Sequence, residues 1–320
     1  NCIYCYIRDM GFSGSPRPYP LSGIQLAYAL AINPAIALGR RGSLLAFGSV
    51  TEPFMPETRE KTLEYLSTLS KELGNPIQLS TKAYVSKKLA AEVKESCRQG
   101  SFLITIVTLT LHEILEPGAP PPQSRYETMR NLRESGFHVS LFLRPILPGL
   151  SFQEFRKIFN KAVESNASGV VLGSMRVTER ILDNLRRAGY PYINEILKRL
   201  PEKPHGARQI TLREVDLKRR LAAMARELGL KVYPSACAAN IEAHGLSCAA
   251  CRMGPCGDPK ALPNFNPSSV IKLAENYGLR ISSLKSDDLK LVMSAEGDRR
   301  AKKQFQEFVK ALIKREVIIR

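Results

Sequence analysis

The 320-residue sequence has no uninterrupted apolar run near the roughly 18 residues that a membrane-spanning helix needs. It does not begin with Met and has no basic-then-apolar leader, so we expect no signal peptide and a chain numbered from inside a longer protein. Glycine and proline contribute 21 residues each, an ordinary share that excludes collagen-like and low-complexity chains. With 44% hydrophobic and 24% charged residues, disorder is excluded as the main state. We therefore expect a folded, cytoplasmic protein with no membrane partner.

Negative charge is in short supply, because 47 basic residues face 30 acidic ones and leave a net charge of +17. A surplus of this size favours a polyanionic partner, most often a nucleic acid, DNA or RNA. The alternative is a solvated basic surface in a basic, heat-adapted proteome. The densest stretch, 299–320, carries eight basic residues, namely Arg299, Arg300, Lys302, Lys303, Lys310, Lys314, Arg315 and Arg320.

Six of the seven cysteines fall into two clusters, and only Cys97 stands apart, in a pattern typical of a packed helix residue. An odd count in a chain too large to need disulfide staples indicates metal or redox chemistry rather than a disulfide framework. The first cluster is Cys2-x-x-Cys5, with Tyr4 directly before the second thiol. Two thiolates cannot hold a metal or cluster alone, so further ligands must come from elsewhere in the chain or from upstream of Asn1.

The second cluster places four cysteines within 20 residues, on a loop that we expect to span 235–260. They are Cys237, Cys248, Cys251 and Cys256. Four thiolates suit either tetrahedral zinc or a [4Fe–4S] cluster, and the spacing does not separate the two. Unliganded thiols remain an alternative, as does a zinc ribbon that pairs Cys2 and Cys5 with Cys248 and Cys251.

Strand and helix patterns alternate from about residue 44 to residue 176. The strand candidates are Leu44–Val50, Ile77–Thr81, Phe102–Thr108, Val139–Arg144 and Gly169–Met175, with helices near 57–73, 85–98, 123–135 and 151–165. The strands are nearly continuous apolar runs, which is typical of a parallel sheet covered by helices. The alternation predicts right-handed crossovers and an α/β, TIM-like partial (β/α) barrel over 1–190. We expect a mostly helical, cysteine-rich extension over 191–320, with basic helices near 211–228 and 298–316.

Five short motifs, in order along residues 1–175, resemble the spore photoproduct lyase-like (DNA repair photolyase-like) family of radical SAM proteins. They are Asn1-Cys2-Ile3-Tyr4-Cys5-Tyr6, Gly48-Ser49-Val50-Thr51-Glu52-Pro53-Phe54, Ser80-Thr81-Lys82, Glu116-Pro117-Gly118-Ala119 and Arg144-Pro145-Ile146-Leu147-Pro148-Gly149. The family's cluster loop is Cys-x3-Cys-x2-Cys, and Cys2, Tyr4 and Cys5 fit its second half. The first cysteine would stand three positions before Asn1, and the first strand before that.

The resemblance implies that three thiolates hold a [4Fe–4S] cluster whose open iron chelates S-adenosylmethionine. One-electron cleavage of the sulfonium then gives a 5′-deoxyadenosyl radical that abstracts a substrate hydrogen. By the same resemblance, Thr51 and Glu52 would bind the methionine amino group and Lys82 its carboxylate. Thr105 or Thr108 would bind the ribose, and Tyr4 and Arg144 complete the predicted cofactor-binding set.

Two features depart from the spore photoproduct lyase pattern. No cysteine hydrogen donor stands near Ser49-Val50-Thr51, which weighs against cleavage of the thymine photoproduct. The cysteines at 237–256 resemble instead the auxiliary clusters of other radical SAM enzymes. The favoured function is a radical SAM enzyme, of lyase or oxidoreductase type, that repairs or modifies a nucleic acid with electrons from a ferredoxin or flavodoxin. The alternatives are a radical SAM enzyme acting on a peptide or small molecule, and a non-catalytic, zinc-containing nucleic-acid-binding protein.

Overall fold

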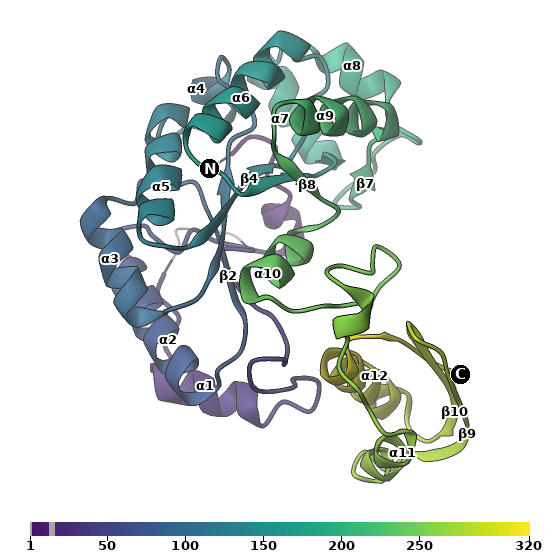
Figure 1. Cartoon of the computed structure of the whole chain (residues 1–320). Helices are drawn as coiled ribbons and strands as arrows, with labels where there is room; N and C mark the ends of the chain where they lie inside the picture. Colours follow the sequence, from purple (N-terminus) through teal and green to yellow (C-terminus); the bar gives the residue numbers. More distant parts are fainter. Residues whose placement is uncertain (1, 13–16) are drawn as a thin grey trace.

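The computed structural model describes residues 2–12 and 17–320, so Asn1 of the first motif lies outside the described residues. Its centre is a six-stranded, all-parallel sheet in the order β1-β2-β3-β4-β5-β8 (Figure 1). The strands are β1 (Leu45–Phe47), β2 (Ile77–Thr81), β3 (Ser101–Thr105), β4 (His138–Leu143), β5 (Gly169–Leu172) and β8 (Lys231–Tyr233). The predicted α/β partial barrel is confirmed.

Helices follow the strands and cover one face of the sheet (Figure 1). They are α2 (Arg59–Glu72), α3 (Lys87–Ser96), α5 (Pro122–Glu134), α6 (Phe152–Glu164) and α9 (Val215–Glu227), and α1 (Gly23–Ala31) packs on α2. Local sequence sets several helix starts: the side chains of Ser86 and Ser151 accept hydrogen bonds from backbone N–H groups in the first turns of α3 and α6. Every residue of β3 is buried, as an apolar strand between two covered faces requires.

The opposite face of the sheet is packed by α10 (Ala236–His244), which follows β8 and contacts β3, β5 and β8 (Figure 1). Its small residues Ala238 and Ala239 form a buried cluster with Leu103, Val171 and Tyr233. The cysteine-rich segment therefore begins as a helix rather than as the loop that the sequence suggested.

The barrel sheet continues past residue 190, where we expected the barrel to end, because β8 pairs with β5. Between these two strands lie β6 (Arg176–Val177), α7 (Glu179–Arg187), α8 (Ile193–Lys198) and β7 (Ile210–Thr211). The boundary at 190 consequently separates strands of one sheet.

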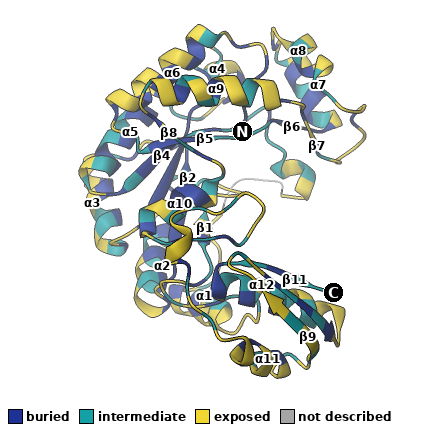
Figure 2. Ribbon diagram, turned by 45° about the vertical axis from the view of Figure 1, so that its right-hand side comes forward, coloured by how far each residue is buried: buried dark blue, intermediate teal, exposed yellow. Residues whose placement is uncertain are grey.

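The C-terminal part forms a second, smaller core around Val270, Leu291, Phe305, Val309 and Val317. Its helices α11 (Pro267–Glu275) and α12 (Arg299–Ile313) pack with a three-stranded sheet of β9 (Arg280–Ser286), β10 (Lys290–Glu296) and β11 (Glu316–Ile319). The sequence analysis missed this sheet, although helices dominate the extension as expected. Figure 2 shows α11 and α12 beside this sheet. Short elements complete the described chain: η1 (Ile7–Met10), α4 (His112–Leu115) and η2 (Pro259–Ala261).

No helix in the described ranges is both long enough and apolar enough to cross a bilayer.

Candidate active site

The carboxyl ends of the parallel strands share one edge of the sheet, and Glu52 is fixed there. One oxygen of its carboxylate accepts a hydrogen bond from Thr81 Oγ1, and the other accepts one from the backbone N–H of Lys82 at 2.8 Å. The turn from β1 toward Glu52 passes very close to β2, since a Cβ on Gly48 would lie 2.0 Å from the Ser80 carbonyl oxygen. Gly48 also has a φ of +77°, which explains the glycine at this place in the motif.

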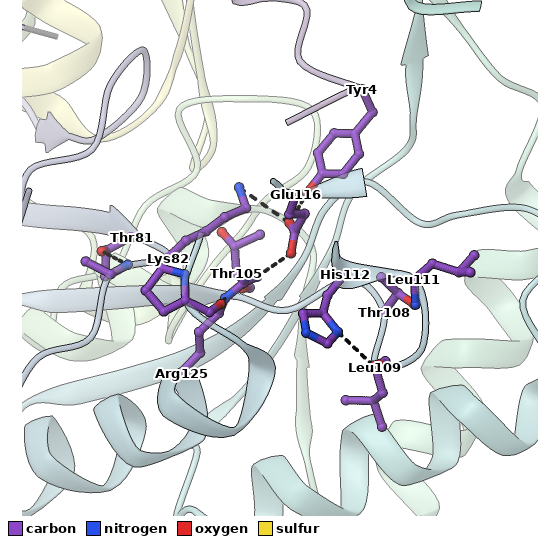
Figure 3. A network of polar contacts seen from close by, with 12 residues as sticks. Tyr4, Thr81, Lys82, Thr105, Thr108, Leu109, Leu111, His112, Glu116 and Arg125 are labelled. Atoms are coloured by element: carbon purple, nitrogen blue, oxygen red, sulfur yellow. Dashed lines mark hydrogen bonds and ion pairs between the residues drawn. The ribbon is translucent and has the colours of Figure 1, made fainter. Parts of the chain in front are cut away.

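Glu116 lies at the centre of a buried polar network at the same edge (Figure 3). Its carboxylate accepts hydrogen bonds from the Tyr4 hydroxyl and from Arg125 Nη1, and Lys82 Nζ lies 3.9 Å from Oε1. The side chains of Glu116 and Arg125 are fully buried, whereas that of Lys82 is 24% exposed. Burial, followed by the Glu116 charge and hydrogen bond, raises the pKa of Tyr4 well above its usual value. The hydroxyl therefore stays protonated and serves as a donor.

The charge balance of this network is positive, because one carboxylate faces two cations. Arg125 donates to Glu116 and also to the carbonyl oxygens of Thr105 and Pro120, at 3.1 and 2.8 Å. Lys82 makes the longer contact and keeps part of its ammonium accessible to solvent. An anionic ligand group at this edge would therefore meet a partly exposed cation held by a buried framework.

Cys2 and Cys5 are half-buried free thiols on either side of the Tyr4 anchor. The backbone N–H of Ile3 donates to the Leu115 carbonyl at 2.9 Å, so the segment that carries both thiols is held against the end of α4, next to Glu116. Within 2–12 and 17–320, no three Cys, His, Asp or Glu side chains are grouped as a metal site. Two thiols of the type that iron–sulfur clusters require are present, and they fit two of the three expected ligands.

The other residues predicted to bind the cofactor differ in exposure and in the contacts that their side chains make within the protein. Thr51 is exposed, and Thr105 is buried at the end of β3. The hydroxyl of Thr108 donates to Glu154 Oε1 at 2.7 Å and accepts a hydrogen bond from the Leu111 N–H, so it shapes the loop after β3. Arg144 is half-buried, with its guanidinium carbon 5.9 Å from the centre of the Phe142 ring.

The cysteines at 237–256 come from two elements. Cys237 lies in the first turn of α10, while Cys248 and Cys256 face each other across an antiparallel bridge with two backbone hydrogen bonds. Burial, followed by the charges of Cys237, Cys248 and Cys251, raises the pKa of Cys256 to about 11. The charges of the other three thiols thus act on Cys256, although no group of three or more Cys, His, Asp or Glu side chains among the described residues could hold a metal ion. Cys97, as expected, is a buried packing residue.

Sequence reasoning missed Arg125, Glu154 and the pair Asp9–Arg180 as parts of this edge. Arg125 lies on the buried side of α5 with no exposed surface, and a charged residue in an otherwise core-facing position was the available signal. Glu154 accepts hydrogen bonds from Thr108, Leu109 and Thr110, a partnership across 44 to 46 residues.

Comparisons with known proteins now bear on this geometry. No protein-family model matches the sequence. Two structures of spore photoproduct lyase, both with dinucleoside spore photoproduct and one also with AdoMet bound, superpose with TM-scores of 0.56 and 0.55. Each covers 72% of this chain and 72% of the lyase, at 14% and 13% identity. The chain shares the fold of these spore photoproduct lyase structures.

Two curated relatives are also similar to this chain in sequence. A radical SAM Nalpha-GlyT isomerase of Pseudomonas phage M6 is 23% identical over 206 residues, 63% of this chain. An uncharacterized protein, ORF301, of Acidianus two-tailed virus is 29% identical over 113 residues, 34% of this chain. The matched parts span 40% and 36% of those two relatives. The similarity to radical SAM enzymes that the motifs indicated is thus found in sequence as well as in fold.

Proposed function

We propose that this protein is a radical SAM enzyme in which Cys2 and Cys5 are two of three ligands of a [4Fe–4S] cluster. When bound, the cluster and S-adenosylmethionine supply one-electron cleavage of the sulfonium and a carbon radical for hydrogen abstraction. One observation carries the proposal: Tyr4, between the two thiols, is hydrogen-bonded to Glu116, which Lys82 also approaches. The cysteine segment and the predicted cofactor contacts thus meet at one edge of the sheet.

The chain's own residues would bind and orient the nucleotide. Glu52, held by Thr81 and the Lys82 N–H, presents a carboxylate suited to an ammonium group, with the exposed Thr51 beside it in sequence. Lys82 presents a partly exposed cation suited to a carboxylate. Since the Thr108 hydroxyl is engaged by Glu154, we assign ribose contact to Thr105, with Arg144 as a further polar group beyond β4.

We further propose a nucleic acid as substrate. Exposed arginines on α9 (Arg219, Arg220 and Arg226) and exposed basic residues on α12 (Arg299, Arg300 and Lys303) provide phosphate contacts in a chain of net charge +17. The two lyase structures bind a dinucleoside photoproduct, which supports this class of substrate. Binding should weaken steeply with salt, because phosphate contacts release counterions.

A second metal centre at Cys237, Cys248, Cys251 and Cys256 is also proposed, with zinc and a [4Fe–4S] cluster as the two candidates. In support, the Ala250 N–H donates to Cys248 Sγ at 3.4 Å, and such a donor two residues after a cysteine stabilises a thiolate. Metal binding would release the proton that the raised pKa of Cys256 holds at neutral pH.

The testing experiment uses the full gene product. After anaerobic reconstitution with iron and sulfide, we expect reductant-dependent cleavage of S-adenosylmethionine, stimulated by DNA or RNA and not by peptide. A ferredoxin or flavodoxin should replace the chemical reductant. Stimulation by peptide alone would move the substrate class to peptides. A colourless protein that holds only zinc and cleaves nothing would refute the enzyme and leave the zinc-containing binding protein.

A further inference from the structure

The segment that carries the two N-terminal thiols is held from two sides. On one side are the Ile3 N–H contact to Leu115 and the Tyr4 hydroxyl contact to Glu116. On the other side, Arg180, the second residue of α7, reaches the same segment from 175 residues away in sequence. This second attachment is not explained by the cofactor contacts described above.

Arg180 makes three hydrogen bonds with the segment. Nη2 donates to the Cys5 carbonyl oxygen at 2.7 Å, while Nε and Nη2 donate to the two Asp9 carboxylate oxygens at 2.7 and 2.8 Å. The planar guanidinium thus joins the peptide of Cys5 to the carboxylate of Asp9 in one fixed geometry. A lysine has a single point charge on a flexible stem and cannot make this set of contacts.

The attachment is itself supported by the start of α7. Thr178 caps the helix, accepting the Ile181 N–H at 3.2 Å, and its hydroxyl donates to Asp9 at 2.8 Å. Although burial alone would raise the pKa of Asp9, the hydrogen bonds from Arg180 and Thr178 lower it below its usual value. Asp9 is therefore a charged, positioned partner at neutral pH.

We propose that Arg180 is a positioning residue for the iron–sulfur site: by holding the Cys5 peptide against Asp9 and α7, it fixes the direction of the Cys5 thiol. This inference rests on the proposed function, since it concerns the same pair of thiols. Residues that are hydrogen-bonded to metal ligands orient those ligands, and their loss commonly lowers metal affinity about 10- to 100-fold. Arg180 touches neither cofactor nor substrate in this assignment.

The test compares three variants of the full gene product after anaerobic reconstitution. Arg180→Gln removes the charged fork, and Arg180→Lys keeps the charge without the fork. Arg186→Gln is the matched control, because Arg186 lies on the same helix and, within the described ranges, forms an ion pair only with the surface residue Asp183, at 3.1 Å. The readouts are iron release to a chelator and the low-temperature EPR spectrum of the reduced cluster.

We expect Arg180→Gln to release iron about 10-fold faster than wild type and to shift the EPR spectrum. The iron-release rate of Arg180→Lys should lie between those of Arg180→Gln and wild type, and the rate of Arg186→Gln should match wild type. Wild-type rates and spectrum in Arg180→Gln would overturn the inference while leaving the proposed function intact. A wild-type protein that holds no iron would instead refute the proposed function.

Folding is monitored by circular dichroism, and Asp9→Asn provides a second route should Arg180→Gln fail to fold. Asparagine keeps the shape of the partner but removes its charge and its bidentate acceptor geometry. We expect Asp9→Asn to release iron faster than Arg186→Gln. Equal rates in these two variants would overturn the proposal independently of Arg180→Gln.

Discussion

The two cysteine regions of this molecule contrast in what surrounds their thiols. Cys2 and Cys5 are too few to hold a cluster, yet they lie in a framework of buried and partly buried polar contacts that includes Tyr4, Glu116 and Arg180. The later set supplies four thiols, but among the described residues the hydrogen bonds to their sulfurs are local, from Ser235 and from Ala250. The number of thiols in a region and the extent of the polar contacts around them are therefore separate properties.

This difference indicates different roles. Buried, charge-assisted networks are costly to build and are typical of sites where a ligand must be oriented. Thiols on a helix and loop need fewer such contacts around them, because the metal itself can order the segment. We infer that the first region is organised for chemistry and the second for holding a metal.

The largest expected difference lies between Cys5→Ala and Cys251→Ala in cleavage of S-adenosylmethionine. Removing a cluster ligand at the first site should lower the rate by more than the roughly 100-fold that loss of a residue hydrogen-bonded to a ligand can cost. Cys251→Ala should lower it by less than about tenfold, because among the described residues Cys251 shares no hydrogen-bond partner with Tyr4, Glu116 or Arg180, and residues without shared partners act nearly independently. Product formation by chromatography measures both. Equal losses would show that the two cysteine regions act as one unit, which would contradict the different roles inferred for them.

The sequence predicted the barrel well because its strands are apolar runs. It missed β9, where only two residues of Arg280–Ser286 are even half-buried, so the strand carries no apolar signal. It missed α10 because a short Ala-rich helix shows no clear helical periodicity.

Motif resemblance brought Tyr4, Glu52 and Lys82 to one edge, and the structure places them there. The partners that hold these residues could not be predicted in the same way. Arg180 joins Cys5 across 175 residues, and Glu154 joins Thr108 across 46. Pairings of this kind depend on the three-dimensional arrangement of strand ends, which local pattern does not contain.

A second prediction concerns the stability of the framework around the first site. Glu116→Gln removes the charge that balances Arg125, whose side chain has no exposed surface. Breaking a buried ion pair from one side typically costs about 3 to 5 kcal/mol, so the free energy of unfolding should fall by about that amount. Urea unfolding measures it, with Glu127→Gln as control, because Glu127 makes an exposed contact with Tyr84. A loss no larger than that of the control would show that the network is dispensable.

The smallest expected effect concerns Glu214, a buried carboxylate beyond β5 on the barrel side of the contrast. Its Oε2 accepts the Met175 N–H at 3.1 Å, while Oε1 is buried without a hydrogen-bond partner among the described residues. Burial raises its pKa from 4.5 to about 7, against the opposing effect of hydrogen bonds from Met175 and Ser174. Between those values the folded chain keeps a proton that the unfolded chain has lost.

Folding stability due to Glu214 should therefore decline as pH rises from 4.5 to 7. Glu214→Gln stays neutral and should remove that decline, so the variant gains on wild type by no more than about 3 kcal/mol between pH 4.5 and pH 8. Urea unfolding at several pH values measures the difference, with Glu202→Gln, at a surface pair with Arg208, as the control. Parallel pH profiles for wild type and Glu214→Gln would mean that this carboxylate ionises normally. Burial in the barrel would then leave the ionisation of this carboxylate unchanged, and Glu214 would no longer distinguish the barrel from the cysteine-rich region.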